Sequence, residues 1–178
     1  MLLSASLLVG SALWLAALVL APYSLTHLPP SAFAYRLAVV AYAVGGSVCH
    51  QQPTRSFHGW GVQLPVCARC TGLYAGGMLG IAVALVALGR RRQLGSEGPD
   101  RWEIRTWRAA LAAAAVPTLA TFALEWSAVA PVSRLARAIA AVPLGLAAGW
   151  VIAMASVGPW TELLHVFGKA GTAGNERR

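Results

Sequence analysis

Uncharged apolar runs dominate this sequence, and several are long enough to cross a membrane. The first, from Leu2 to Ala21, contains no charged residue and ends at Pro22. A helix needs roughly 17–25 such residues to cross the hydrocarbon core of a bilayer. Composition agrees, because 57% of the 178 residues are hydrophobic, 11% are charged and the mean hydropathy is +0.61. A soluble all-helical domain would need a polar face that these runs lack, so the sequence predicts a multi-pass membrane protein.

The runs predict an all-α bundle of about five transmembrane helices. Its predicted spans are residues 2–21, 31–48, 72–88, 109–124 and 138–157. We expect one transmembrane domain over residues 1–168 and a disordered basic tail over residues 169–178. The first run lacks the basic start of a signal peptide and is long for one, which favours a retained span.

Glycines recur at four-residue spacing in two of these spans. Gly72, Gly76 and Gly80 share one face of the third span, and Gly145 and Gly149 do the same in the fifth. In a membrane such faces allow close approach of another helix. They indicate close packing, and they also make a homo-oligomer possible.

Positive charge in this chain indicates topology rather than nucleic-acid binding. The formal net charge is +8, but the basic residues gather between Gly89 and Arg108 and at the C-terminus, without a binding motif. Arginine-rich loops stay in the cytoplasm. With five spans, this predicts a cytoplasmic C-terminus, with the N-terminus and the loop between the second and third spans outside.

That loop carries most of the reactive side chains. The stretch from Cys49 to Gly77 contains all three cysteines of the chain, together with His50 and His58. An odd number of cysteines cannot form a framework of disulfides within one chain. Cys67 and Cys70 form a C-x-x-C pair, whose two thiolates can hold half of a tetrahedral zinc site. Cys49 and either His50 or His58 would complete a set of three cysteines and one histidine.

Two other interpretations of the cysteines stay open. A C-x-x-C pair at a helix N-terminus, with Arg69 inside it, also suits a quinone-linked membrane thiol–disulfide oxidoreductase. Such enzymes generally need a second cysteine pair, whereas this chain adds only Cys49. In the third interpretation the protein is a non-catalytic scaffold or transport component, in which the metal only folds the loop.

Charged residues are expected to gather near the same loop. The predicted topology brings Arg55 and Arg69 close to Glu125, Arg134 and Arg137 at the outer mouth of the bundle. Glu125 is the obvious candidate base there, and Arg55 and Arg69 can bind an anionic group such as a lipid phosphate or pair with Glu125. These three residues are the catalytic candidates. No nucleophilic triad, phosphate-binding loop or paired-carboxylate motif is present.

The loop also resembles a known family. C-H-Q at residues 49–51, R-S-F at 55–57 and P-V-C-A-R-C-T-G-L-Y-A-G at 65–76 look like the signature of small bacterial and archaeal membrane proteins of unknown function. The resemblance implies a place in the cytoplasmic membrane and a functional site in the loop. It brings no established reaction. The family also has S-N-x-x-R and T-G later in the chain, where this sequence has Ser133-Arg134, Arg137 and Ala140-Ala141.

Overall fold

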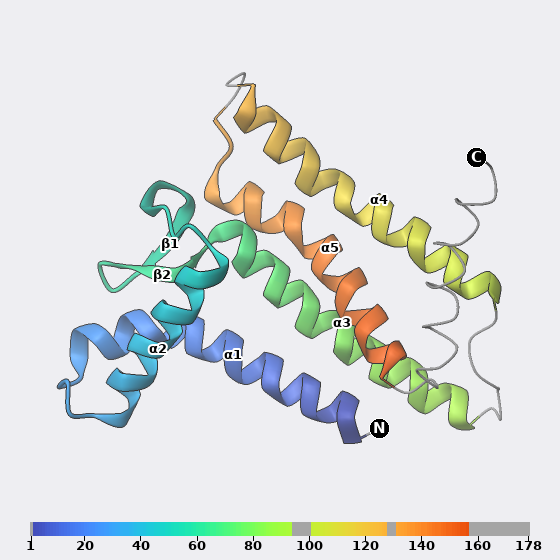
Figure 1. Ribbon diagram of the computed structural model, residues 1–178, viewed down its shortest axis with the longest axis horizontal. Coiled ribbons are helices and arrows are strands. Elements are labelled where there is room, and N and C mark those ends of the chain that lie inside the picture. Colours follow the sequence, from blue (N-terminus) through green and yellow to red (C-terminus); the bar gives the residue numbers. More distant parts are fainter. Residues whose placement is uncertain (1, 94–100, 128–130, 157–178) are drawn as a thin grey trace, which may run out of the picture.

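The protein folds into five α-helices and one short β-hairpin, as the computed structural model in Figure 1 shows for residues 2–93, 101–127 and 131–156. The elements are α1 (Leu2–His27), α2 (Phe33–Val48), a 3-10 turn (Pro53–Arg55), β1 (Ser56–Gly59), β2 (Val62–Cys67), α3 (Ala68–Gln93), α4 (Arg101–Trp126) and α5 (Arg134–Ala155). The predicted tail at residues 169–178 and the final residue of the predicted span 138–157 lie outside the described residues.

Four of these helices are long and apolar enough to cross a membrane. They cover Leu2–His27, Ala68–Arg90, Thr106–Trp126 and Arg134–Ala155. Large apolar side chains on their outer surfaces, such as Leu13, Val86 and Leu119, are 66%, 60% and 62% exposed, which is a surface suited to lipid rather than water. The predicted all-α membrane bundle is confirmed.

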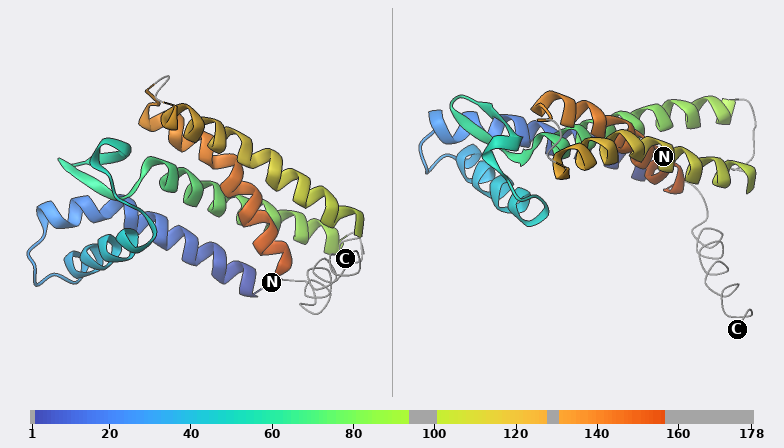
Figure 2. Two further views of the ribbon diagram at one scale, coloured as in Figure 1. Left: turned by 45° about the horizontal axis from the view of Figure 1, so that its top comes forward. Right: turned by 90° about the horizontal axis from the view of Figure 1, so that it is seen from above.

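The helix predicted at residues 31–48 is present as α2, but it differs from the others. It has 16 residues, which corresponds to about 24 Å, and this is shorter than the roughly 30 Å hydrocarbon core of a bilayer. It packs on the C-terminal half of α1 through Ala38 and Ala41, which face Ala21. Figures 1 and 2 show it lying across the direction of α3, α4 and α5 instead of running along them.

The beginning of α1 lies at the opposite end of the bundle from the cysteine loop. Leu7 and Leu8 pack against a core whose members come from the C-terminal halves of α3 and α5, namely Ile81, Ala84, Ala153 and Met154. At the other end of α1, the ring of Tyr23 lies 5.3 Å from that of Trp60 in the hairpin. The sequence prediction placed the N-terminus and the cysteine loop on one side. In the structure the two lie at opposite ends of the bundle, because α1 runs its length and α2 does not return along it.

The loop itself contains a β-hairpin that the sequence analysis did not predict. β1 and β2 are antiparallel, with Gly59 paired to Val62 across a two-residue turn. Trp60 and Gly61 in that turn have φ angles of +51° and +80°, as a type I′ turn requires. The hairpin returns the chain from α2 to the first residue of α3.

α3 and α5 make the closest helix contact, and the predicted glycine faces form it. A Cβ atom on Gly76 would lie 2.3 Å from the carbonyl oxygen of Val142, and one on Gly149 would lie 2.1 Å from that of Gly77. The two glycine faces therefore meet each other within one chain. They are not free for the homo-oligomer that the sequence suggested.

Replacing Gly76 with alanine is expected to lower the free energy of unfolding by about 1–3 kcal/mol, because the added methyl group must push two backbones apart. Gly10→Ala is the matched control, since nothing lies within 4 Å of a Cβ there and alanine favours a helix by up to about 1 kcal/mol. Thermal unfolding of the two variants in the same detergent measures the difference. Equal stability of the two variants would contradict this packing.

Candidate metal centre

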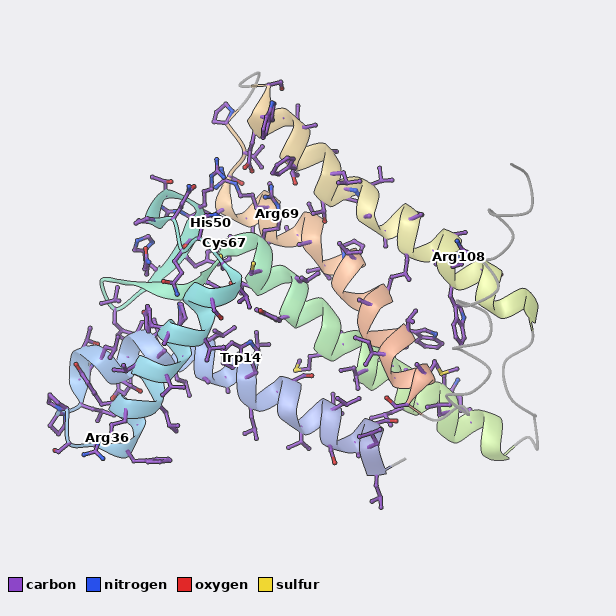
Figure 3. All side chains as sticks on the ribbon, viewed as in Figure 1. Trp14, Arg36, His50, Cys67, Arg69 and Arg108 are labelled. Carbon is purple, nitrogen blue, oxygen red and sulfur yellow. The ribbon has the colours of Figure 1, made fainter. Side chains whose placement is uncertain are left out.

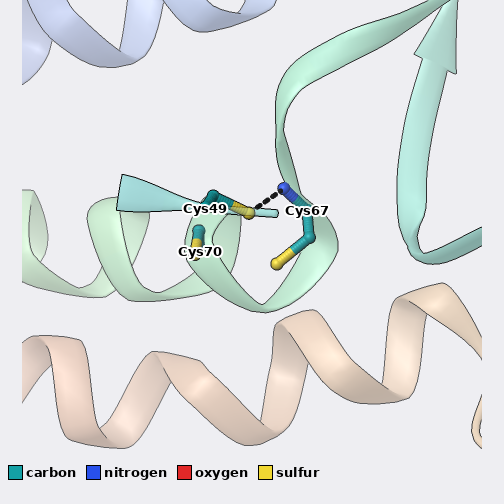
Figure 4. A group of neighbouring side chains, drawn as sticks. All are labelled: Cys49, Cys67 and Cys70. Carbon is teal, nitrogen blue, oxygen red and sulfur yellow. Dashed lines mark hydrogen bonds between the residues drawn. The ribbon is translucent and has the colours of Figure 1, made fainter. Parts of the chain in front are cut away.

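Three chain segments bring the three cysteines together. Cys49 ends α2, Cys67 is the last residue of β2, and Cys70 lies in the first turn of α3. Their sulfur atoms all lie within 4.8 Å of one another, and each residue is partly buried. Figure 4 shows the cluster at the beginning of α3. Cysteines separated by up to 21 positions in the sequence thus form one group of potential ligands.

A glutamine holds the segment after Cys49 against β2. The side-chain Nε2 of Gln51 donates to the carbonyl oxygens of Tyr42 at 2.8 Å and Pro65 at 2.6 Å. Gln63 in turn donates through its Nε2 to the carbonyl oxygen of Gln51 at 3.1 Å. The end of α2 comes this close because Gly45 has no side chain, and a Cβ there would lie 2.3 Å from the oxygen of Pro65. These contacts fix the distance between Cys49 and Cys67.

The environment of Cys67 favours the thiolate form of that residue. The backbone N–H of Cys67 donates to Sγ of Cys49 at 3.3 Å, as the dashed line in Figure 4 shows. A hydrogen bond from the Cys70 thiol lowers the pKa of Cys67 to about 5. Cys67 also directly precedes α3, where the partial positive charge of a helix N-terminus stabilises an anion. Thiolate is the form that binds a metal ion.

In metal-free protein, Cys67 should therefore react with iodoacetamide at an almost constant rate between about pH 6 and pH 8. Its pKa lies below this range, so the thiolate fraction is already near its maximum. A thiol with the ordinary pKa of about 8.5 would instead react almost tenfold faster for each added pH unit. Peptide mapping by mass spectrometry measures the rate, and a tenfold rise per pH unit at Cys67 would contradict the lowered pKa.

The two histidines predicted as ligands do not join the sulfurs. His50 follows Cys49 directly and is exposed, and His58 is exposed on β1, where it pairs with Gln63. Among the described residues, the group of potential ligands around the sulfurs contains only the three cysteines. Figure 3 shows His50 and Cys67 at the same end of the molecule.

The geometry of the cluster suits a tetrahedral ion with one position left open. Zinc–sulfur bonds of about 2.3 Å place sulfur ligands roughly 3.8 Å apart around a tetrahedral ion, so separations below 4.8 Å require only small side-chain adjustments. A closed structural site has four protein ligands, whereas three leave a position for water or a substrate.

A second cluster lies beside the first and joins Glu125 to three arginines. Oε1 of Glu125 accepts from Nε of Arg137 at 2.6 Å and from a terminal nitrogen of Arg69 at 3.0 Å. Arg55 lies 3.8 Å from Oε2 of the same carboxylate. Arg134 is also nearby, and its Nε donates to the carbonyl oxygen of Thr54 at 3.3 Å. The structure therefore places these charged residues close together, as the sequence predicts.

Arg137 and Gln51 are not among the site residues predicted from the sequence. Arg137 lies in the first turn of α5, four residues after the N-cap Ser133, whose side chain accepts from the N–H of Ala136. A basic residue in the first turn of an apolar helix opposes the helix dipole, and that was the available signal. No pattern in the sequence indicates the hydrogen bonds of Gln51.

The fold and the site define a helical membrane protein with a cluster of three cysteines that can hold a metal ion. Residues 49–151 match the family described as "Predicted membrane protein (DUF2085)", and the chain belongs to this family. The match begins at Cys49 and includes the cysteine cluster, Glu125 and the arginines around it.

A relative from the archaeon Methanocaldococcus jannaschii is described as "Uncharacterized protein MJ1492" and is 41% identical over 64 residues. The alignment covers 36% of this chain and 41% of that protein, so it spans less than half of either. No solved structure matches the chain.

Proposed function

We propose that this protein is a membrane metalloprotein that binds one zinc ion through Cys49, Cys67 and Cys70. The observation that carries the proposal is the convergence of all three sulfurs within 4.8 Å from three different elements. Thiolate ligands favour zinc among the common divalent ions, and within the described residues this group contains no carboxylate that would suit magnesium or calcium. His50 is the nearest residue in sequence that could take the fourth position.

Protein purified in detergent without chelators should contain about one zinc ion per chain, and this result would support the proposal. Elemental analysis should be combined with a count of reactive thiols before and after chelation. Bound zinc should protect the three thiols, and chelation should expose them. Metal-free protein whose three thiols react freely from the start would contradict the proposal.

A thiol–disulfide oxidoreductase is the second candidate, and the lowered pKa of Cys67 favours it. In that function the Cys67 thiolate would attack a partner disulfide, and the thiol of Cys70 would then displace the partner to leave a Cys67–Cys70 disulfide and a reduced partner. In the oxidising direction, the Cys67–Cys70 disulfide would take two electrons from a partner dithiol, which becomes a disulfide. A membrane quinone would then reoxidise the reduced pair to the Cys67–Cys70 disulfide and become quinol. The Cys70→Ser variant should accumulate a mixed disulfide between Cys67 and the partner, which non-reducing electrophoresis detects.

For the orientation, we propose that α1, α3, α4 and α5 cross the membrane and that α2 lies at its outer surface. The position of Leu7 and Leu8 beside the ends of α3 and α5 supports this arrangement. The arginine-rich segment after α3 then lies in the cytoplasm together with the beginning of α1, and the cysteine cluster faces outward. A membrane-impermeant thiol reagent applied to intact cells should label the metal-free cysteines. A tag before α1 should resist external protease.

A further inference from the structure

The cluster around Glu125 holds more positive charge than its carboxylate can neutralise. Arg55, Arg69 and Arg137 lie 3.8, 3.0 and 2.6 Å from its oxygens, so three positive charges surround one negative charge. The side chains of Arg137 and Arg69 are 11% and 21% exposed, and that of Glu125 is 8% exposed. Arg55 is 44% exposed, so water can solvate its charge, but Arg69 and Arg137 share one carboxylate in a sheltered place, which leaves a positive charge there uncompensated and is unfavourable.

The hydrogen bonding of this cluster is also incomplete. Nε of Arg69 is buried and has no hydrogen-bond partner in the part of the chain that the structure describes. Arg137 and Arg69 both donate to the same oxygen of Glu125, although a guanidinium group has five N–H donors in a planar fork. Among the described residues, Oε2 of Glu125 is likewise buried without a hydrogen-bond partner, so the cluster holds unpaired groups of both kinds. A phosphate group would supply the acceptor that Nε of Arg69 lacks.

The helices add to the positive potential at this place. Arg69 is the second residue of α3, and Arg137 is the fourth residue of α5. Helix N-termini carry a partial positive charge of roughly half a unit. An anion there is favourable, whereas an arginine adds further positive charge. Two such termini and three guanidinium groups converge here, and the end of α4 at Glu125 offsets only part of that charge.

We propose that Arg55, Arg69 and Arg137 form a binding site for a phosphate group. Phosphate carries one to two negative charges and several acceptor oxygens, and guanidinium groups bind it through paired hydrogen bonds. Arg55 is 44% exposed and only 3.8 Å from Glu125, so it is the member that can turn toward an arriving ligand. In the orientation proposed above, this end of the bundle lies at the membrane surface, so phospholipid headgroups are one source of the phosphate. A phosphorylated solute or free phosphate is the other.

This site is separate from the metal centre. Arg69 lies between Cys67 and Cys70 in sequence, but its side chain extends to α4, where its guanidinium also lies 5.7 Å from the centre of the Phe122 ring. Replacing cysteines should therefore leave phosphate binding in place, and replacing Arg55 should leave the metal in place.

The test compares Arg55→Gln with Arg36→Gln, which removes the same charge from an exposed position on α2. Thermal unfolding is followed in a neutral detergent at constant ionic strength. One series adds inorganic phosphate, and the other adds phosphatidylglycerol to the micelles, with phosphatidylcholine, whose headgroup carries no net charge, as the control. A ligand that binds the folded state raises the melting temperature. Arg55→Gln should need about tenfold more ligand for half of the shift, since losing one charge-assisted contact weakens binding by roughly that factor.

Each outcome decides the proposal. A shift with phosphatidylglycerol alone that Arg55→Gln weakens and Arg36→Gln does not would support the site and identify a lipid headgroup as its ligand. A shift with inorganic phosphate as well would support a site that accepts phosphate from solution. Equal weakening by both variants, or no shift with either ligand, would overturn the proposal. The metal content of Arg55→Gln protein, measured in parallel, confirms that the cysteine cluster is intact.

Discussion

Replacing Cys67 with serine is expected to reduce the bound zinc from about one ion per chain to less than about a tenth. The thiolate of Cys67 is the ligand whose environment most favours ionisation, and its sulfur lies within 4.8 Å of the other two. A serine hydroxyl stays protonated at neutral pH and binds zinc weakly. Elemental analysis of protein purified under identical conditions measures the change.

His58→Ala is the control for that experiment, because His58 is exposed on β1 and lies outside the group of sulfur ligands. It should keep its zinc. His50→Ala should show whether the adjacent imidazole takes the fourth position: if it does, the variant binds zinc more weakly but still binds it. Full zinc occupancy in Cys67→Ser protein would exclude the proposed site.

Replacing Glu125 with glutamine is expected to lower the free energy of unfolding by about 3–5 kcal/mol, the usual cost of removing one partner from a buried ion pair. The side chain of Glu125 is 8% exposed, and its carboxylate joins α4 to Arg69 of α3 and Arg137 of α5. Without that charge, three guanidinium groups would repel one another at the end of the bundle. Chemical unfolding in detergent measures the loss.

A double variant distinguishes this electrostatic effect from a simple loss of packing. Glu125→Gln combined with Arg137→Gln removes one of the unpaired positive charges, so it should be more stable than the sum of the two single changes predicts. If the two effects simply add, Glu125 does not hold the arginines through its charge.

The long helices could be predicted because a helix that crosses the hydrocarbon core of a bilayer needs an apolar run of a certain length. Apolar runs such as Leu2–Ala21 are long enough to cross a bilayer, and glycines at four-residue spacing indicated the contact between α3 and α5. The role of α2 could not be predicted in this way. Its composition is as apolar as that of a span, and only its contacts with α1 and β2 show that it lies across the end of the bundle.

The members of the candidate site that could be predicted are those whose residue type itself indicates metal binding or charge. Cys49, Cys67 and Cys70 stand out by type and spacing, and Glu125 is a lone acid beside a bundle of apolar helices. The hairpin was not predicted, because β1 and β2 are short and lack a clear alternation of apolar and polar residues. Gln51 was missed as a positioning residue because its role consists of hydrogen bonds to Tyr42 and Pro65, which are distant in sequence.

The central claim is that three cysteine sulfurs hold one metal ion. X-ray absorption spectroscopy at the zinc edge, recorded on the purified full-length protein, tests it most directly. We predict three sulfur neighbours at about 2.3 Å and one nitrogen or oxygen neighbour at about 2.0–2.1 Å. A zinc ion surrounded by nitrogen and oxygen alone, or protein that holds no metal, would contradict the claim.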